Sequence, residues 1–190
     1  MPCIRKQSPL STPTILVGGA DRGGHFFKST IITNSGVMQI GDPVSVTTQA
    51  AGNGMVTRRY NAAGDPIVGV CVGFGRGNGQ AVAFDSGTND TVTVAADNET
   101  VNQIYAILDI TPGAAWSCPI SGTIHGTQVF GVGRWVDPVA GANCDQIDET
   151  TITATAYQGR GWVCLGPDPD NTTRGLVMVG ESFITLADET

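Results

Sequence analysis

The chain has few charged residues. Asp, Glu, Lys and Arg make up 14% of its 190 residues, whereas a soluble domain usually carries about 25%. Its surface is therefore built largely from Thr, Asn, Gln, Ser and Gly. Such a weakly charged surface is suited to being covered by neighbouring molecules, but this low charge also lies within the ordinary variation of small β proteins. Only two residues are Lys, and the net charge is -7. Because nucleic-acid binding depends on clustered cations, we expect no nucleic-acid partner.

Leucine is scarce as well. The sequence holds 6 Leu against 19 Val and 22 Thr, a balance that disfavours helices and favours pleated strands. Gly and Pro, at 26 and 10, are frequent enough to separate many short strands by turns. We therefore predict an all-β fold, a compact antiparallel sandwich or barrel of about eight to ten short strands. A chain of this length supports one well-filled core or two small ones, and we predict one main domain.

Long apolar runs are missing too. No stretch approaches the ~18 consecutive apolar residues of a membrane span, and the first ten residues lack the apolar stretch of a signal peptide. We expect no membrane partner and a protein assembled in a cytoplasm. In such a reducing compartment we predict structural thiols, which pack as small apolar residues, for all five cysteines: Cys3, Cys71, Cys118, Cys144 and Cys164. They lack the short paired spacings of a zinc site.

Groups that could perform catalysis are sparse. His25 and His125 are the only imidazoles, and neither lies in the sequence context of an activated nucleophile. Acid pairs such as Asp148 with Glu149 occur, but a glycosidase needs two acids placed across a cleft, which the sequence does not establish. We predict that the protein is not an enzyme and binds no cofactor.

Two segments resemble ligand-binding loops without meeting their requirements. The glycine-rich residues 73–79 precede a predicted strand at 81–84, whereas a phosphate-binding loop opens a helix. The segment from Asp168 to Asn171 lacks the glycine and the distal glutamate of a calcium-binding loop. We therefore predict a hairpin tip and a proline-rich turn, respectively, and no metal site.

From residue 38 onward the sequence has a regular pattern of strands and turns. Gly41-Asp42-Pro43 and Gly64-Asp65-Pro66 each precede alternating β-branched residues. Arg58 and Arg59 are adjacent on a predicted strand, so they point to opposite faces and form no basic patch. We also expect tight turns at Asn53-Gly54 and Asn78-Gly79, and a strand or a loop, not a helix, at 148–156. The predicted strands are 44–48, 55–60, 67–74, 81–84, 91–95, 104–109, 128–135, 162–165 and 176–183.

Residues 1–37 differ from the rest. Three prolines and glycine pairs at 18–19 and 23–24 interrupt any long element, which indicates an extended N-terminal arm ahead of a β-rich domain at 38–190. Within the arm, His25-Phe26-Phe27-Lys28 is either an anchor on a partner or the first strand of the core.

Five segments of the sequence, taken in order, resemble a known family. They resemble the head decoration, or cement, proteins of tailed bacteriophages, in which a "GDPV" strand, an "iaGVvvGf" strand and a late "pdN" turn before the last strand recur in that order. The likeness extends over about residues 38–185 and rests on residues 40–44, 64–70, 92–98, 104–109 and 169–177.

The resemblance implies a virion protein that binds the outer surface of an assembled icosahedral head, bridges several major capsid subunits and has no catalytic residues. The implied partners are the major capsid protein and further copies of the chain, as a dimer or trimer. For capsid or protomer contacts we expect the arm residues Arg22, His25, Phe26, Phe27 and Lys28. A tail or fibre component that binds host glycans is the alternative, and a glycan-hydrolysing enzyme is a third reading.

Overall fold

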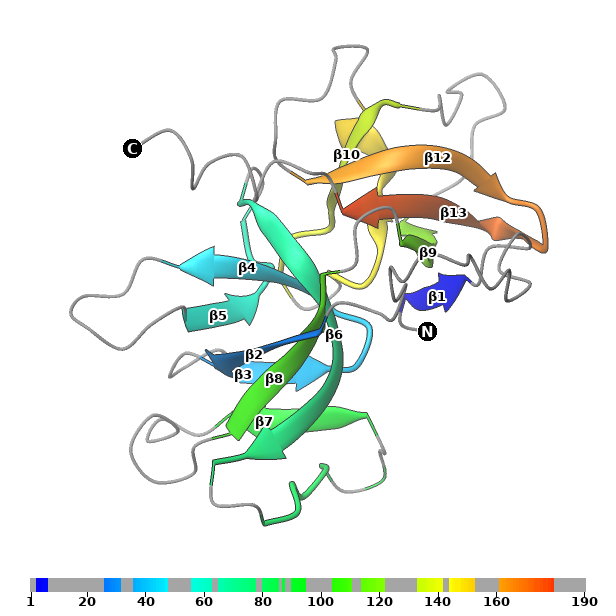
Figure 1. Cartoon of the computed structure of the whole chain (residues 1–190). Coiled ribbons are helices and arrows are strands. Elements are labelled where there is room, and N and C mark those ends of the chain that lie inside the picture. Colours follow the sequence, from blue (N-terminus) through cyan, green and yellow to red (C-terminus); the bar gives the residue numbers. More distant parts are fainter. Residues whose placement is uncertain are drawn as a thin grey trace, which may run out of the picture.

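The computed structural model describes thirteen separate stretches of the chain. All regular elements in these stretches are strands, thirteen in number, apart from one short 3-10 helix, η3 (Glu149–Thr151) (Figure 1). The all-β prediction is confirmed, and the strands outnumber the expected eight to ten because several have only two to four residues. No helix in these stretches is long and apolar enough to cross a membrane. The described residues are 3–6, 26–31, 36–47, 56–62, 65–77, 80–85, 87, 90–94, 104–110, 114–121, 133–141, 144–152 and 161–179.

One set of strands closes into a barrel with a two-stranded ribbon beside it. The pairings in the barrel are antiparallel except between its first two strands, β2 and β5. The ribbon packs against the barrel because Met38, Val92 and Val94 share a core cluster with buried barrel residues. The barrel order is β2 (Phe26–Ile31), β5 (Val56–Arg59), β4 (Pro43–Thr47), β6 (Ile67–Arg76) and β8 (Ile104–Asp109), and the ribbon is β3 (Gly36–Gln39) with β7 (Thr91–Val94).

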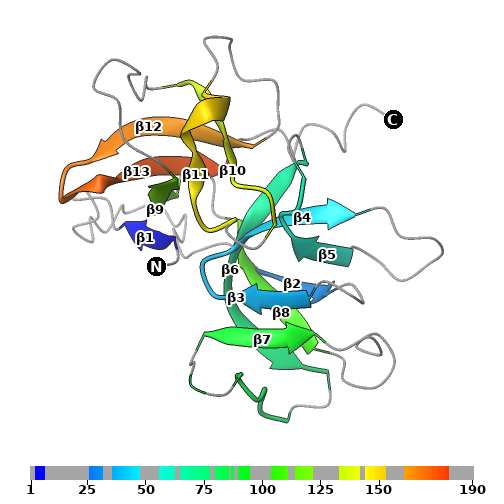
Figure 2. The same cartoon turned by 180° about the vertical axis from the view of Figure 1, so that it is seen from behind.

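The remaining strands form a second sheet, seen from behind in Figure 2. Besides its place in the strand order, β9 also pairs with β13, so the ring from β9 to β13 closes on itself and β1 lies outside that ring. All its pairings are antiparallel except β9 with β11. The order is β1 (Ile4–Lys6), β9 (Ala115–Ser121), β11 (Ile147–Asp148), β10 (Trp135–Pro138), β12 (Trp162–Asp168) and β13 (Asn171–Val179).

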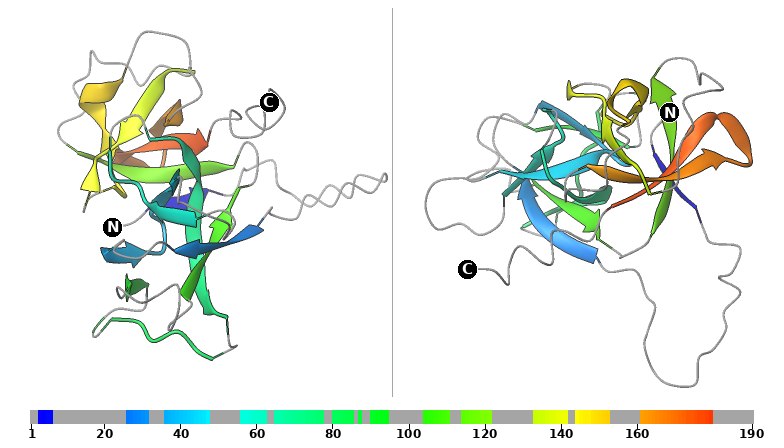
Figure 3. Two further views of the ribbon diagram at one scale, coloured as in Figure 1. Left: turned by 90° about the vertical axis from the view of Figure 1, so that its left-hand side faces the viewer. Right: turned by 90° about the horizontal axis from the view of Figure 1, so that it is seen from above.

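The two closed sheets share a hydrophobic core. Tyr60, Ile67 and Val70 of the barrel side join one cluster with Trp116 and Trp162 of the second sheet, and the two bodies lie side by side in the views of Figure 3. Because apolar side chains of both sheets are removed from water together, their burial couples the two bodies into one unit.

The N-terminal segment contributes one strand to the second sheet and one to the barrel. β1 belongs to the second sheet and β2 to the barrel, and the proposed boundary between residues 37 and 38 falls inside β3. Of the two readings of the segment around Phe26, the described part, Phe26–Ile31, has the position of a core strand.

Most predicted strands overlap strands of the structure, with three differences. Of the predicted strand 128–135, residues 128–132 lie outside the described residues and the strand observed there, β10, begins only at Trp135. The segment 148–156, expected to be a strand or a loop, includes the short 3-10 helix η3.

Residues 81–84 are not a strand; instead Asp85 holds this segment against β7, where its backbone N–H donates to the Thr91 carbonyl at 2.8 Å and its carboxylate accepts from Thr93. Gly73 and Gly75 lie inside β6 rather than in a hairpin tip. The turns expected at Asn53-Gly54 and Asn78-Gly79 lie outside the described residues.

Gly161 is required both by its backbone and by a neighbouring ring. Its φ is +73°, and a Cβ there would lie 2.5 Å from the Trp135 ring; Gly141 has φ +83° and open space around it. Alanine at either position costs about 1–2 kcal/mol in backbone strain. We expect Gly161→Ala to lower the free energy of unfolding by about 1–3 kcal/mol more than Gly141→Ala, because the Trp135 ring must move. Urea denaturation measures both losses, and equal losses would contradict this packing.

Candidate functional site

The aspartate of each Gly-Asp-Pro motif pairs with one arginine of β5. Arg59 contacts Asp42, with Nε 2.8 Å from a carboxylate oxygen. Arg58 contacts Asp65 at 2.9 Å. The two neighbouring arginines therefore pair with different carboxylates. Both aspartates of the repeated motif thus serve as ion-pair partners of β5.

The first of these turns is pinned to the barrel wall. Gly41 has φ +96°, a conformation that favours glycine. Its N–H donates to the Cys71 carbonyl at 2.7 Å, and the Cys71 N–H donates to the Asp42 carbonyl at 2.9 Å. The Asp42 carboxylate also accepts from the Gln39 N–H at 2.8 Å. The turn thus joins β3, β4 and β6 through satisfied backbone groups.

Arg59 also links the barrel to the second sheet. Its Nε donates to Cys144 Sγ at 3.0 Å, and Cys144 lies between β10 and β11 of the second sheet. Burial raises the pKa of the Cys144 thiol far above its ordinary value and that of Cys71 to about 12. Both cysteines are buried and outside any disulfide, as expected of structural thiols.

Burial also changes the titration of Asp42, which is fully buried. Desolvation raises its pKa to about 6 in spite of the opposing attraction of Arg59. Burial works against the charge of Arg59 as well, but the Asp42 carboxylate and Cys144 hold the pKa of Arg59 above its ordinary value. The negative charge of Asp145 raises the pKa of Asp42 further.

This titration predicts a pH-dependent stability. Folded Asp42 binds its proton below about pH 6, whereas the unfolded chain binds it only below about pH 4, so between these values the folded state holds more protons. The contribution of Asp42 to the free energy of unfolding is therefore greatest below pH 4 and decreases by roughly 3 kcal/mol as the pH rises to 6. Urea denaturation of wild type and Asp42→Asn across this range measures it. A constant difference between the two proteins would contradict the raised pKa.

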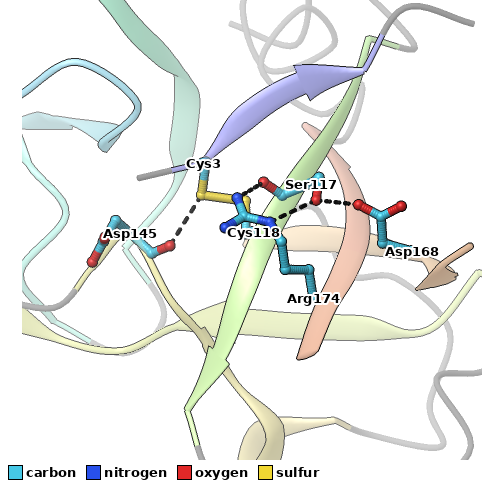
Figure 4. The surroundings of a disulfide bond; sticks show 6 residues. All are labelled: Cys3, Ser117, Cys118, Asp145, Asp168 and Arg174. Atoms are coloured by element: carbon cyan, nitrogen blue, oxygen red, sulfur yellow. Dashed lines mark hydrogen bonds between the residues drawn. A yellow bond between two sulfur atoms is a disulfide. The ribbon is translucent and has the colours of Figure 1, made fainter. Parts of the chain in front are cut away.

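A disulfide joins Cys3 to Cys118 (Figure 4). The prediction of five structural thiols is therefore wrong for these two residues and holds for the three unpaired ones. Cys3 enters the shared core through β1, and its Sγ lies 3.1 Å from the Asp145 carbonyl oxygen. The two residues are 115 positions apart, so no local spacing in the sequence indicates the pair.

A buried polar network lies next to this disulfide. The Arg174 Nε donates to Ser117 Oγ at 2.8 Å, and Ser117 Oγ donates to an Asp168 carboxylate oxygen. The other Asp168 oxygen accepts from the Asp170 N–H at 3.0 Å. This arrangement confirms that Asp168 to Asn171 is the turn between β12 and β13, and it occupies both Asp168 oxygens with protein donors.

The structure describes only some of the expected contact residues. Phe26, Phe27 and Lys28 lie in β2, whereas Arg22 and His25 lie outside the described residues. His125 does as well. Among the stretches that the structure describes, no three His, Cys, Asp or Glu side chains are placed to hold a metal ion.

Acid and aromatic features have structural roles where the structure describes them. Asp148 caps η3 by accepting from the Thr150 N–H. Among the side chains that the structure describes, three large apolar ones are exposed, Ile4, Val37 and Phe84, and Phe84 packs edge-on against Phe74.

Comparisons with protein-family models, with curated proteins and with solved structures found no match.

Proposed function

We propose that this protein is a head decoration protein of a tailed bacteriophage, which binds the outer surface of an assembled capsid and bridges major capsid subunits. The observation that carries the proposal is the ordered set of sequence phrases from Ile40 to Val177. In the first of them, Asp42 pairs with Arg59 and the backbone of Gly41 and Asp42 is hydrogen-bonded to Cys71 of β6, so this segment contributes to the rigidity of the barrel. Two closed sheets with a shared core also make a body firm enough to transmit load between subunits.

Attachment at several points explains how a weakly charged surface holds on to a shell. After the first contact, every further contact to a neighbouring subunit is effectively intramolecular, so modest interfaces add up to tight binding. The bound protein stabilises only the assembled shell, because isolated subunits do not present the bridged surface. Linkage then shifts the equilibrium toward the intact head.

Removal of residues 1–30 is not a suitable test of such an interface. It would delete β1, Cys3 with its disulfide bond to Cys118, and most of the barrel strand β2. Point substitutions avoid this loss. Arg22 and His25 belong to no described strand, and Arg134 is an exposed arginine on the second sheet that serves as a matched control.

We expect the double variant Arg22→Ala, His25→Ala to bind heads that lack the protein about tenfold more weakly than wild type, a loss of about 1.4 kcal/mol. Arg134→Ala should bind like wild type. Co-sedimentation with purified heads over a range of protein concentrations measures the apparent Kd and the number of copies bound. Binding of the double variant at wild-type affinity would remove the arm from the interface, and no binding of the wild type would refute the proposed function.

A further inference from the structure

β1 is a small addition to an already closed sheet. It has three residues and pairs with β9 alone, Ile4 with Ser117, Arg5 with Trp116 and Lys6 with Ala115. The same β9 residues pair on their other edge with β13, and the ring of β9, β11, β10, β12 and β13 closes without β1. The β9 edge that receives β1 is therefore built by other parts of the chain.

The attachment of β1 depends mainly on one residue. Ile4 is 51% exposed, whereas Cys3 is 5% exposed and lies in the shared core, bonded to the fully buried Cys118. A three-residue ladder gives little binding free energy by itself, since short strands are marginal in isolation. The disulfide between Cys3 and Cys118 is thus the main interaction that holds this strand against β9.

The chain between β1 and β2 is long enough to reach another molecule. Residues 7–25 separate Lys6 from Phe26, and fully extended they span up to about 70 Å. A compact body of this length is only about 40 Å across. The β1 strand of one copy can therefore reach the β9 edge of a copy that lies next to it.

We propose that the β9 edge also accepts β1 from a second copy of this chain, with Cys3 of one copy disulfide-bonded to Cys118 of the other. The exchanged strand makes the same contacts as the internal one. The free energies of the exchanged and the internal arrangement therefore differ only by the entropy of the tether, that is, of the connecting residues 7–25. A tether of this kind holds β1 at an effective concentration in the millimolar range near its own β9. Copies packed about 50 Å apart are present at about 10 mM. Pairing of β1 with a neighbouring copy therefore competes with internal pairing when the copies form an array, and it is negligible in dilute solution.

The covalent step needs a small disulfide as oxidant, such as glutathione disulfide. The Cys3 thiolate attacks it, forms a mixed disulfide and releases one glutathione thiolate. The Cys118 thiolate of the second copy then attacks the Cys3 sulfur and releases the second glutathione thiolate. Two protein thiols become one disulfide, one glutathione disulfide becomes two glutathione thiols, and the two cysteine protons end on those thiols.

Two single variants test the exchange in solution without any capsid. Cys3→Ser keeps only Cys118 of the pair and Cys118→Ser keeps only Cys3, so neither closes the internal bond. Mixed in a glutathione redox buffer, they should give a covalent heterodimer on non-reducing gels. In its tryptic digest the peptide ending at Arg5 should be joined to the peptide containing Cys118. Each variant alone is the control and should not give this linkage.

A second measurement uses the wild-type protein alone, so it does not depend on how the variants fold. Isotope-labelled and unlabelled protein are mixed, equilibrated in the same buffer and digested. Linked peptides with one labelled and one unlabelled partner should be undetectable at about 1 µM and abundant at about 1 mM, since the tether's effective concentration lies in the millimolar range. Absence of mixed peptides at 1 mM, linkage through other cysteines, or failure of the wild type to form the bond would each overturn the proposal. The proposed capsid function stands or falls separately, on binding to heads.

Discussion

Replacing Arg59 by methionine is expected to lower the free energy of unfolding at pH 8 by about 3–5 kcal/mol, because it leaves a buried carboxylate without its partner. Asp42 is fully buried; one of its carboxylate oxygens accepts from Arg59 Nη2 at 3.1 Å, and the other lies 2.8 Å from Arg59 Nε. The same arginine donates to Cys144 across the junction of the two sheets. Its loss therefore affects the first Gly-Asp-Pro turn and the link between the bodies together. Urea denaturation gives the loss directly.

Arg58→Met is the matched control for this substitution. Arg58 and Asp65 also form an Arg–Asp pair, with Nη2 2.9 Å from one carboxylate oxygen, but their side chains are 33% and 21% exposed. Partly exposed pairs contribute about 0–1 kcal/mol, so this variant should be nearly as stable as wild type. The cost of Arg59→Met should also shrink toward pH 4, where Asp42 is protonated and needs no cation. Equal costs for both arginines, or a cost independent of pH, would contradict the account of the buried pair.

Removal of the disulfide is the second large effect. The Cys3–Cys118 bond closes a loop of more than one hundred residues, for which the chain-entropy estimate is about 4–5 kcal/mol and measured losses are typically about 2–5 kcal/mol. We expect the free energy of unfolding of the double variant Cys3→Ala, Cys118→Ala to be lower than that of wild type by about 2–5 kcal/mol, so that it unfolds at a lower urea concentration. Denaturation with and without a thiol reductant supplies the control. Reductant should destabilise the wild type and leave the double variant unchanged, and a wild type indifferent to reductant would contradict the bond.

The sequence predicted those strands whose signal lies within the strand itself. Ile104–Asp109 matches the structure at both ends, and Thr91–Val94 is exposed and buried in alternation as its sequence indicates. By contrast, β9 was not predicted because Ser117, Cys118 and Pro119 interrupt the apolar pattern. Its strand character comes from partners on both edges, which are distant in the sequence.

The same limit applies to the candidate site. The adjacency of Arg58 and Arg59 predicts that they face opposite sides, and in the structure they pair with different carboxylates. Which carboxylate each meets depends on the barrel register, which no local pattern specifies. The disulfide was missed because the compartment was inferred first and the cysteines were then interpreted within it. The sequence identified the charged residues and the cysteines, but which of them pair with one another depends on the tertiary structure.

The proposed function requires that the protein adhere to the outside of a viral head. Electron microscopy of purified particles, combined with quantitative mass spectrometry of their proteins, shows whether it does. We expect density for this fold on the outer shell at repeated lattice positions, in copies comparable in number to the capsid subunits it bridges. Density confined to the tail, or a copy number too small to cover the shell, would contradict it.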